Sequence, residues 1–193
     1  VDQLEILVTL ARVDISTCWS LMIGASASAV MAAFLPDEGV AQLFGHSPWP
    51  TAASSLAPTG RARRCAGGYR VSGCWGFGSG VRHAHGVMAK CLVEEASTED
   101  RPQQISAFVP IDEVEILDDW NVSGLRGSGS NSYVVNDVFV PDCFIAVIRP
   151  LTQYRGGSRA SVLHLRLPIE HGAVALGGAR RALDEVVQQA TSK

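Results

Sequence analysis

A glycine-rich stretch, residues 67–85, constrains the fold of this chain more than any other feature. It begins with Gly67 and Gly68, which can supply the positive φ of a tight turn, so we expect a hairpin there. Large residues then alternate with Arg70 and Ser72, the period of a half-buried strand. Farther on, glycines alternate with bulky residues, and such glycines often mark a close approach of the backbone to a ligand or another segment.

If the alternation continues without a bulge, Trp75, Phe77 and Ser79 share one face of the strand. Two aromatic rings and a hydroxyl beside bare backbone would suit a flat ring with polar edges, such as an isoalloxazine. The alternative is a bulged strand in an ordinary β-sandwich. These residues alone do not decide between the two interpretations.

The composition excludes several classes of function. The formal net charge of -3 argues against a nucleic-acid partner, because nucleic-acid binding needs a basic face. Charged residues and prolines interrupt the apolar runs before they could span a bilayer, and the N-terminus lacks the basic region of a signal peptide, so we expect no membrane partner. Five cysteines without a CxxC pair fit a reducing, cytoplasmic location. The first residue is not Met and the last residues are helical in pattern, so we expect a piece of a longer protein.

The pattern along the chain predicts helices, then strands, then a helix. Apolar spacing predicts a helix over 15–35 with Ser16 as N-cap, and a short helix over 37–44 that ends at Gly45. Short apolar runs between turn residues predict a β region over 51–141. A charged loop over 95–104 and a loop-rich connection over 144–158 are expected, and a helix from about Glu170 to Lys193. The expected strands, beyond the hairpin, are 87–94, 105–109, 114–117 and 133–140.

No catalytic constellation stands out. His83 and His85 alternate, so on a strand they would face opposite sides, and no further ligands for a metal can be placed near either one. Residues 124–131 are rich in glycine and include Arg126, so they could form an anion-binding nest, but a loop leading into the next strand is the favoured interpretation. We therefore expect no metal site.

Three blocks of sequence carry a family resemblance. They are residues 68–84, with the run Trp-Gly-Phe-Gly-Ser-Gly; residues 120–130, followed by Val-Phe-Val-Pro; and residues 171–183. In this order they resemble flavin-dependent monooxygenases with the acyl-CoA dehydrogenase fold. The resemblance implies an α+β fold: the end of an N-terminal helical domain over 1–46, a central β-sandwich or barrel over 47–141, and over 142–193 a connection and the first helix of a C-terminal bundle.

The resemblance also implies a function. Residues 53–62 lack the Thr-Glu-Pro pattern of acyl-CoA dehydrogenases and are similar instead to two-component hydroxylases. In those enzymes a separate reductase supplies reduced flavin, FMN or FAD, and a flavin C4a-hydroperoxide made with O2 hydroxylates a phenolic substrate. The alternatives are an acyl-CoA dehydrogenase and an incomplete fragment without catalysis. The family further implies a homotetramer.

Site residues follow from the same resemblance. The catalytic group is unknown and is expected in C-terminal helices that this sequence does not contain. Without those helices, we expect the apolar stripe through Leu176, Leu183 and Val187 to be exposed or covered by another chain. Trp19 and His83 are expected in the substrate pocket. The expected flavin-binding residues are Ser54, Ser55, Trp75, Phe77, Gly78 and Ser79.

Overall fold

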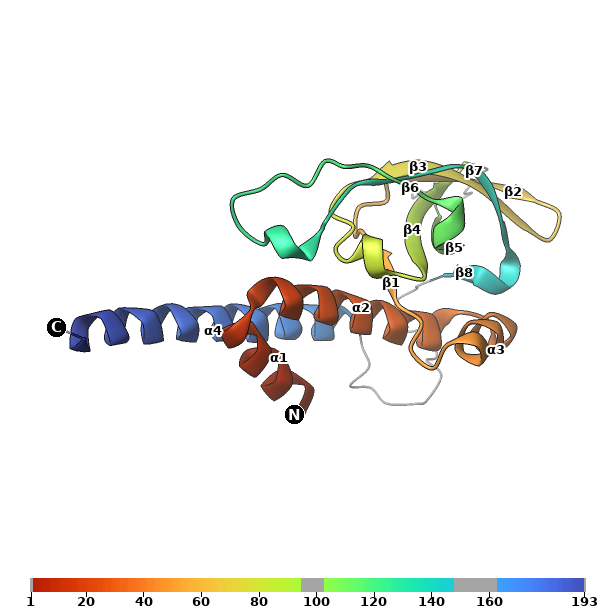
Figure 1. Cartoon of the computed structure of the whole chain (residues 1–193). Coiled ribbons are helices and arrows are strands. Elements are labelled where there is room, and N and C mark those ends of the chain that lie inside the picture. The colour runs from red at the N-terminus through yellow and green to blue at the C-terminus, as the bar shows by residue number, and fades with distance from the viewer. Residues whose placement is uncertain (1, 95–102, 148–162, 193) are drawn as a thin grey trace.

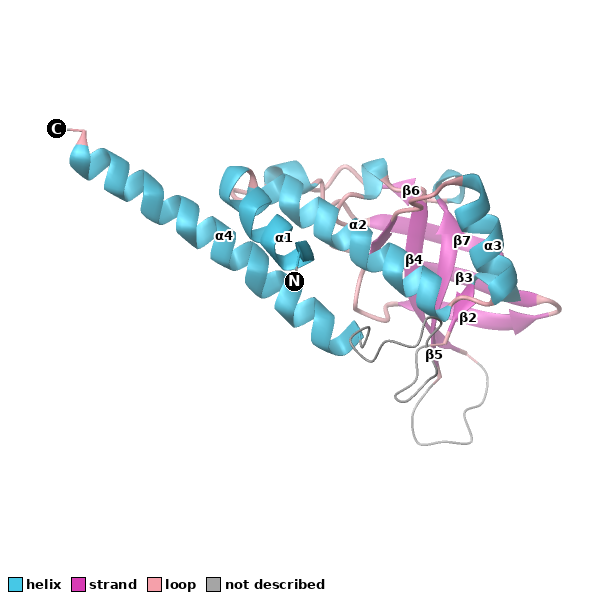
Figure 2. Cartoon of the chain, turned by 90° about the horizontal axis from the view of Figure 1, so that it is seen from below, coloured by secondary structure: helices cyan, strands magenta, loops and turns pink. Residues whose placement is uncertain are grey.

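The computed structural model describes residues 2–94, 103–147 and 163–192. Its helices form one layer and its strands form a curved sheet above them (Figure 1). The C-terminal helix runs along the helical layer and projects beyond it, which is plain in two views (Figures 1 and 2). The helices are α1 (Asp2–Val13), α2 (Ile15–Phe34), α3 (Asp37–His46) and α4 (Leu163–Thr191).

Helix ends differ slightly from the sequence prediction. Asp14, not Ser16, is the N-cap of α2: its side chain accepts a hydrogen bond from the Thr17 N–H at 2.6 Å, which satisfies one of the free donors at the helix start. Helix α3 runs through Gly45 to His46, and its C-cap is Ser47. Gly45 is therefore an interior residue of the helix and not its cap. Helix α4 begins at Leu163, earlier than expected, and contains Pro168.

Helix α1 packs against α4, and a cluster around Leu7, Met22 and Val174 fills the space between the helices. The close contact depends on Gly177. A Cβ atom there would lie 2.4 Å from the Val8 carbonyl oxygen, so only a glycine allows the helices to approach this closely.

The strands form one mixed sheet rather than two stacked sheets. Their order is β6-β7-β3-β2-β4-β5-β8, and β1 pairs with β4 in parallel. The pair β2–β4 is also parallel, whereas the remaining pairs are antiparallel. The strands are β1 (Ala52–Ser54), β2 (Gly60–Cys65), β3 (Gly68–Trp75), β4 (Gly86–Val93), β5 (Gln104–Pro110), β6 (Glu115–Ile116), β7 (Tyr133–Pro141) and β8 (Ile145–Ala146).

The hairpin predicted at the start of the glycine-rich stretch is confirmed. Strands β2 and β3 are antiparallel, with Cys65 opposite Gly68, and Gly67 in the turn has a φ of 77°. Farther along β3 the register with β7 shifts between Val71 and Gly73, which is a bulge. The Asp137 N–H donates to the Ser72 hydroxyl at 2.9 Å across this bulge.

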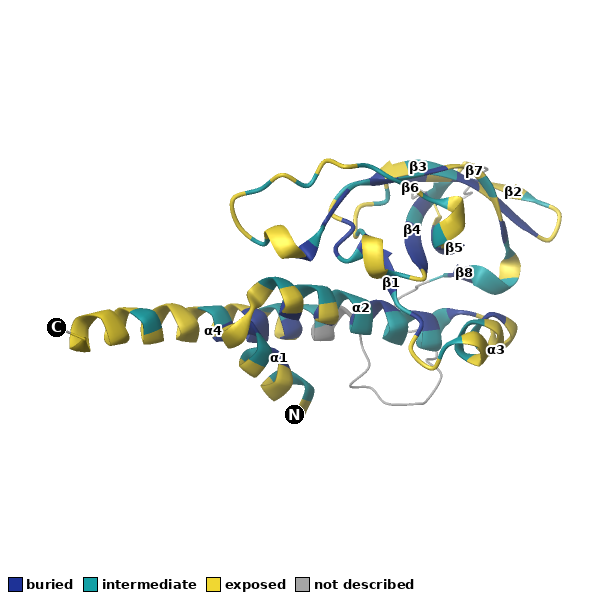
Figure 3. Ribbon diagram, in the orientation of Figure 1, coloured by how far each residue is buried: buried dark blue, intermediate teal, exposed yellow. Residues whose placement is uncertain are grey.

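The inner side of the sheet forms the largest apolar core (Figure 3). Trp75 and Tyr133 are both fully buried there and stack at 5.4 Å between ring centroids. The Trp75 indole N–H donates to the Lys90 carbonyl at 2.9 Å, so its polar atom is satisfied. Gly60 lies against this ring: a Cβ atom there would lie 2.1 Å from it. The inner side of the sheet is therefore closely packed.

The exposed stripe expected on the C-terminal helix is confirmed. Leu176 is 48% exposed, Leu183 64% and Val187 53%, and Figure 3 shows that the projecting half of α4 is mostly exposed. The charged loop expected over 95–104 and the connection over 144–158 lie largely outside the described residues.

One expectation about membranes is corrected. Helix α2 is long and apolar enough, by length and composition alone, to cross a bilayer, so the apolar runs are not all too short for that. Core helices pass the same test, and α2 contacts both helical neighbours, α1 and α4, as well as β1.

Candidate functional site

Two cavities lie on opposite faces of α2. The larger has a volume of about 670 Å³ and is bordered by α1, by the segment around Thr51 and by Ser79, Gly80 and His83. The smaller, of about 250 Å³, is bordered by Ser54, by β4 and β5, and by His171 of α4. The α2 residues that line the larger cavity include small ones, which leave the space open: Ser20, Gly24, Ala25, Ser28, Ala29 and Ala32.

Ser79 reaches the larger cavity because the chain leaves the sheet just before it. Strand β3 ends at Trp75, and Phe77 has a φ of 61°, which turns the backbone. The turn is held by a neighbouring loop: the Gly78 N–H donates to the Asn131 carbonyl at 3.1 Å, and the Gly80 N–H donates to the Ser128 carbonyl at 2.9 Å. Ser79 is therefore placed by backbone hydrogen bonds.

The Ser79 hydroxyl belongs to a buried network. The indole N–H of Trp19 donates to Ser79 Oγ at 3.0 Å. Ser79 Oγ lies 2.8 Å from Ser130 Oγ, which lies 2.7 Å from Ser128 Oγ. The exposures of Ser79, Ser128 and Ser130 are only 7%, 2% and 4%. Ser128 and Ser130 belong to the glycine-rich stretch over 124–131, which forms a short 3₁₀ turn and a loop before β7, so the interpretation of that stretch as a loop leading into a strand is confirmed.

Trp19 links the two cavities. Its indole N–H bonds Ser79, which lines the larger cavity, and the edge of its ring meets His171, which lines the smaller one, at 5.0 Å between centroids. The neighbour of His171, Glu170, is 1% exposed and accepts hydrogen bonds from Ser26 Oγ at 2.5 Å and Gln3 Nε2 at 2.9 Å. These two hydrogen bonds join helices α1, α2 and α4 through the Glu170 carboxylate.

The expectation that Trp75, Phe77 and Ser79 share one face is wrong. Trp75 lies inside the sheet core and borders neither cavity, so its ring is not free to wall a ligand. Phe77 is 73% exposed, packs edge-on against Trp120 at 6.1 Å and also borders neither cavity. The cause is the end of the strand at Trp75 together with the positive φ at Phe77.

The remaining predicted residues are divided between the cavities. Ser54 and Ser55 line the smaller cavity, whereas Ser79 and His83 line the larger. Gly78 lines neither; a Cβ atom there would lie 2.7 Å from Tyr133, so this glycine permits close packing.

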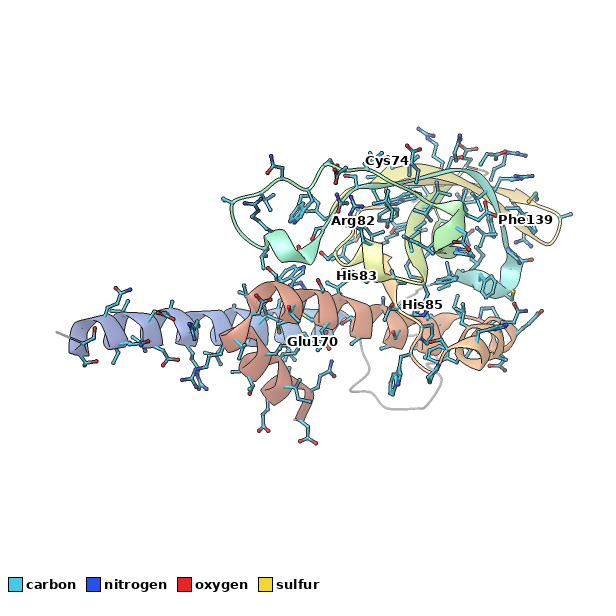
Figure 4. The ribbon with its side chains drawn as sticks, viewed as in Figure 1. Cys74, Arg82, His83, His85, Phe139 and Glu170 are labelled. Carbon is cyan, nitrogen blue, oxygen red and sulfur yellow. The ribbon has the colours of Figure 1, made fainter. Side chains whose placement is uncertain are left out.

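His83 and His85 were expected to face opposite sides if they lay on a strand. The structure places both in the turn before β4, near the helical layer (Figure 4). His83 borders the larger cavity, whereas His85 Nδ1 accepts a hydrogen bond from the Thr51 N–H at 3.2 Å. Figure 4 also shows Arg82 on the same turn; its guanidinium donates to Asp118 at 2.7 Å. His85 thus has a structural partner, and His83 is the one that borders a cavity.

The two buried cysteines, Cys18 and Cys91, offer no ready nucleophile. Burial raises the pKa of the Cys91 thiol to about 12 and also raises the pKa of Cys18, so both remain protonated at neutral pH. Among the residues that the structure describes, no group of three or more His, Cys, Asp or Glu side chains converges on a point where a metal ion could bind.

Sequence reasoning missed Ser128, Ser130, Glu170 and His171 as site residues. Glu170 gave one usable signal, because a carboxylate at the start of an apolar helical stretch must find partners if it is buried. The serine network gave none, since it depends on how a loop folds against a distant turn.

The larger cavity has the properties of a small-molecule site. Its volume is within the usual range for ligand pockets, its walls are mainly apolar, and a few polar side chains, among them Ser79 and His83, line it. Gly80, with a φ of 73°, lines the same cavity beside Ser79. A flat ring with a polar edge fits these features.

No family model matches the chain. Individual proteins with similar sequences and structures nevertheless agree on one family. A pigment production hydroxylase from a Rhodococcus species is 34% identical over 141 residues, which is 72% of this chain and 35% of that protein. The oxygenase component of an FADH2-dependent resorcinol hydroxylase from a Rhizobium species is 34% identical over 116 residues, 60% of this chain and 28% of that protein.

The solved structure of XiaF from a Streptomyces species, in complex with FADH2 and glycerol, superimposes with a TM-score of 0.78 at 26% identity. The superposition covers 98% of this chain and 49% of XiaF. The chain belongs to the flavin-dependent monooxygenases with the acyl-CoA dehydrogenase fold. It spans about a third of the length of the curated relatives named here.

Proposed function

We propose that the protein containing these residues is the oxygenase component of a two-component, flavin-dependent monooxygenase that hydroxylates a phenolic compound. The observation that carries the proposal is the apolar cavity of about 670 Å³ with the Ser79 hydroxyl at its edge. The relatives support the hydroxylase side of the family, since they are hydroxylases and one acts on resorcinol. The acyl-CoA dehydrogenase alternative has no comparable support among them.

The cofactor in this proposal is reduced flavin, FMN or FAD. The ring would lie in the larger cavity, where Ser79, Gly80 and the small residues of α2 would hold it. Ser54 and Ser55 lie at the other cavity and would meet a different part of the flavin. Phe77 borders neither cavity and Trp75 is buried in the sheet core, so we assign neither residue a contact with the flavin.

Reduced flavin would supply the electrons that activate O2. The described residues would bind and orient the reactants and keep water away. Apolar α2 side chains exclude water, which limits the loss of electrons to H2O2. Trp19 holds Ser79 in place through their 3.0 Å hydrogen bond, and the pair would help to orient the ring. His83 borders the same cavity, so with Trp19 we assign it to the substrate side.

The wider assignment is part of the same proposal. Residues 1–46, 47–141 and 142–193 would be the end of a helical domain, the β domain and the start of a second helical domain. The exposed apolar stripe of α4 supports assembly as a homotetramer, because a bundle helix needs helical partners. A separate flavin reductase would provide the cofactor, and the unpaired cysteines favour the cytoplasm.

The test is turnover by the complete gene product that contains these residues. The protein is mixed with a flavin reductase, NADH, FAD or FMN, O2 and resorcinol, and both hydroxylated product and H2O2 are measured. We expect product to form, and Ser79→Ala to release more H2O2 per product while flavin affinity changes less, because one neutral hydrogen bond contributes only about 0.5–1.5 kcal/mol. Absence of product across a panel of phenols would contradict the proposal, and an unchanged ratio in Ser79→Ala would remove Ser79 from the site.

A further inference from the structure

The buried serine network has a defined direction. Each serine hydroxyl has one proton to donate. The Ser128 hydroxyl donates to the Leu125 carbonyl at 2.8 Å, so its proton is used. In the 2.7 Å contact between Ser128 and Ser130, Ser130 must then be the donor. In the 2.8 Å contact between Ser130 and Ser79, Ser79 must be the donor in turn.

Both ends of the network favour this direction. At one end the Leu125 carbonyl can only accept, and it also accepts the Trp120 indole N–H at 3.1 Å. At the other end the Trp19 indole N–H can only donate, and it occupies one lone pair of Ser79 Oγ. With this direction every hydroxyl proton is bonded inside the protein, whereas the opposite direction would leave the proton of Ser79 without one of these partners. Since all three serines are buried, the fully bonded arrangement is the stable one.

We infer that Ser128 and Ser130 make Ser79 a hydrogen-bond acceptor toward the larger cavity, so that the site selects a ligand presenting an N–H group. The inference rests on the proposed function. A reduced flavin carries a hydrogen on N5, whereas N5 of an oxidised flavin is an acceptor without one. An oxidised ring with its N5 edge at Ser79 would bring two lone pairs together. Ser128 and Ser130 are therefore positioning residues that select the redox state of the flavin.

The test compares the binding of the two redox states. FAD and dithionite-reduced FAD are titrated into the complete protein without O2, and dissociation constants are measured by fluorescence. The wild type is expected to bind reduced FAD more tightly. Ser130→Ala frees the Ser79 proton, so oxidised FAD gains a donor and the preference for reduced FAD falls by about threefold to tenfold, the value of one neutral hydrogen bond.

Two further variants make the test decisive. Ser128→Ala removes the acceptor of the Ser130 proton, so it should shift the preference in the same direction, and it decides the matter if Ser130→Ala does not fold. Ser123→Ala is the matched control, an exposed serine of the same loop region, and should change neither constant. A merely structural role would weaken both redox states by the same factor, and that result in Ser130→Ala or Ser128→Ala overturns the inference. Failure of the wild type to bind either form would overturn the proposed function, and this inference with it.

Discussion

The interior of the sheet and the projecting half of α4 both present apolar faces, yet only the first is covered. Trp75 and Tyr133 are fully buried inside the sheet, whereas Leu183 is 64% and Val186 63% exposed. The sheet curves around its own apolar residues, so its strands supply each other's partners. A single helix cannot do this, because its stripe needs a second element. An apolar pattern therefore marks a face for burial but does not say which segment covers it.

The largest effect is expected inside the sheet. Trp75→Ala removes a fully buried ring that stacks on Tyr133 and leaves a cavity, so it should lower the free energy of unfolding by about 3–5 kcal/mol. Denaturant unfolding of purified protein measures the change. A loss below about 1 kcal/mol would mean that the sheet interior is loosely packed, and the comparison with α4 would fail.

A smaller effect is expected at Gly60, where the sheet backbone touches the same ring. Gly60→Ala places a Cβ atom 2.1 Å from Trp75, so the ring or the strand must shift, at a cost of about 1–3 kcal/mol. Gly45→Ala is the matched control, because nothing lies within 4 Å of the added atom and Gly45 lies in helix α3. There the substitution should be neutral or stabilise by about 0.5–1 kcal/mol. Equal effects at the two glycines would contradict the described packing.

The smallest effect on unfolding is expected on α4. Leu183→Gln changes an exposed side chain, so the free energy of unfolding of the monomer should change by no more than about 0.5 kcal/mol. If the stripe is an assembly surface, the same substitution should weaken association of the complete protein, which sedimentation measures as a shift toward smaller species. An unfolding loss as large as that of Trp75→Ala, without any change in association, would show that the chain itself covers this residue.

The sequence was sufficient for features that depend on local pattern. The hairpin at Gly67, helix α2 and strand β7 follow from turn residues and apolar period, and the three blocks in order were sufficient for the family. The pattern could not show where β3 ends, because the positive φ at Phe77 comes from a loop that holds the next residues from far along the chain. For the same reason the pattern predicts a flavin contact at Trp75, which is a core residue.

The cavities were outside what the sequence could predict, because each is bordered by several elements. Trp19 and His83 were expected in a pocket, and both lie at the larger cavity or against a residue that lines it. The serine network depends on contacts between Ser79 and residues about fifty positions later in the chain. In the folded protein Ser79 Oγ and Ser130 Oγ lie 2.8 Å apart. No local pattern encodes such a contact.

The proposed function depends above all on whether the larger cavity binds reduced flavin. Ala29→Phe places a large ring in this cavity, on the wall formed by α2, whereas Ala41→Phe places the same ring at an exposed position of α3 that borders neither cavity. Anaerobic fluorescence titration with reduced FAD should give wild-type affinity for Ala41→Phe and a loss of roughly tenfold or more for Ala29→Phe. Wild-type affinity in a folded Ala29→Phe protein would contradict the assignment of the flavin to this cavity.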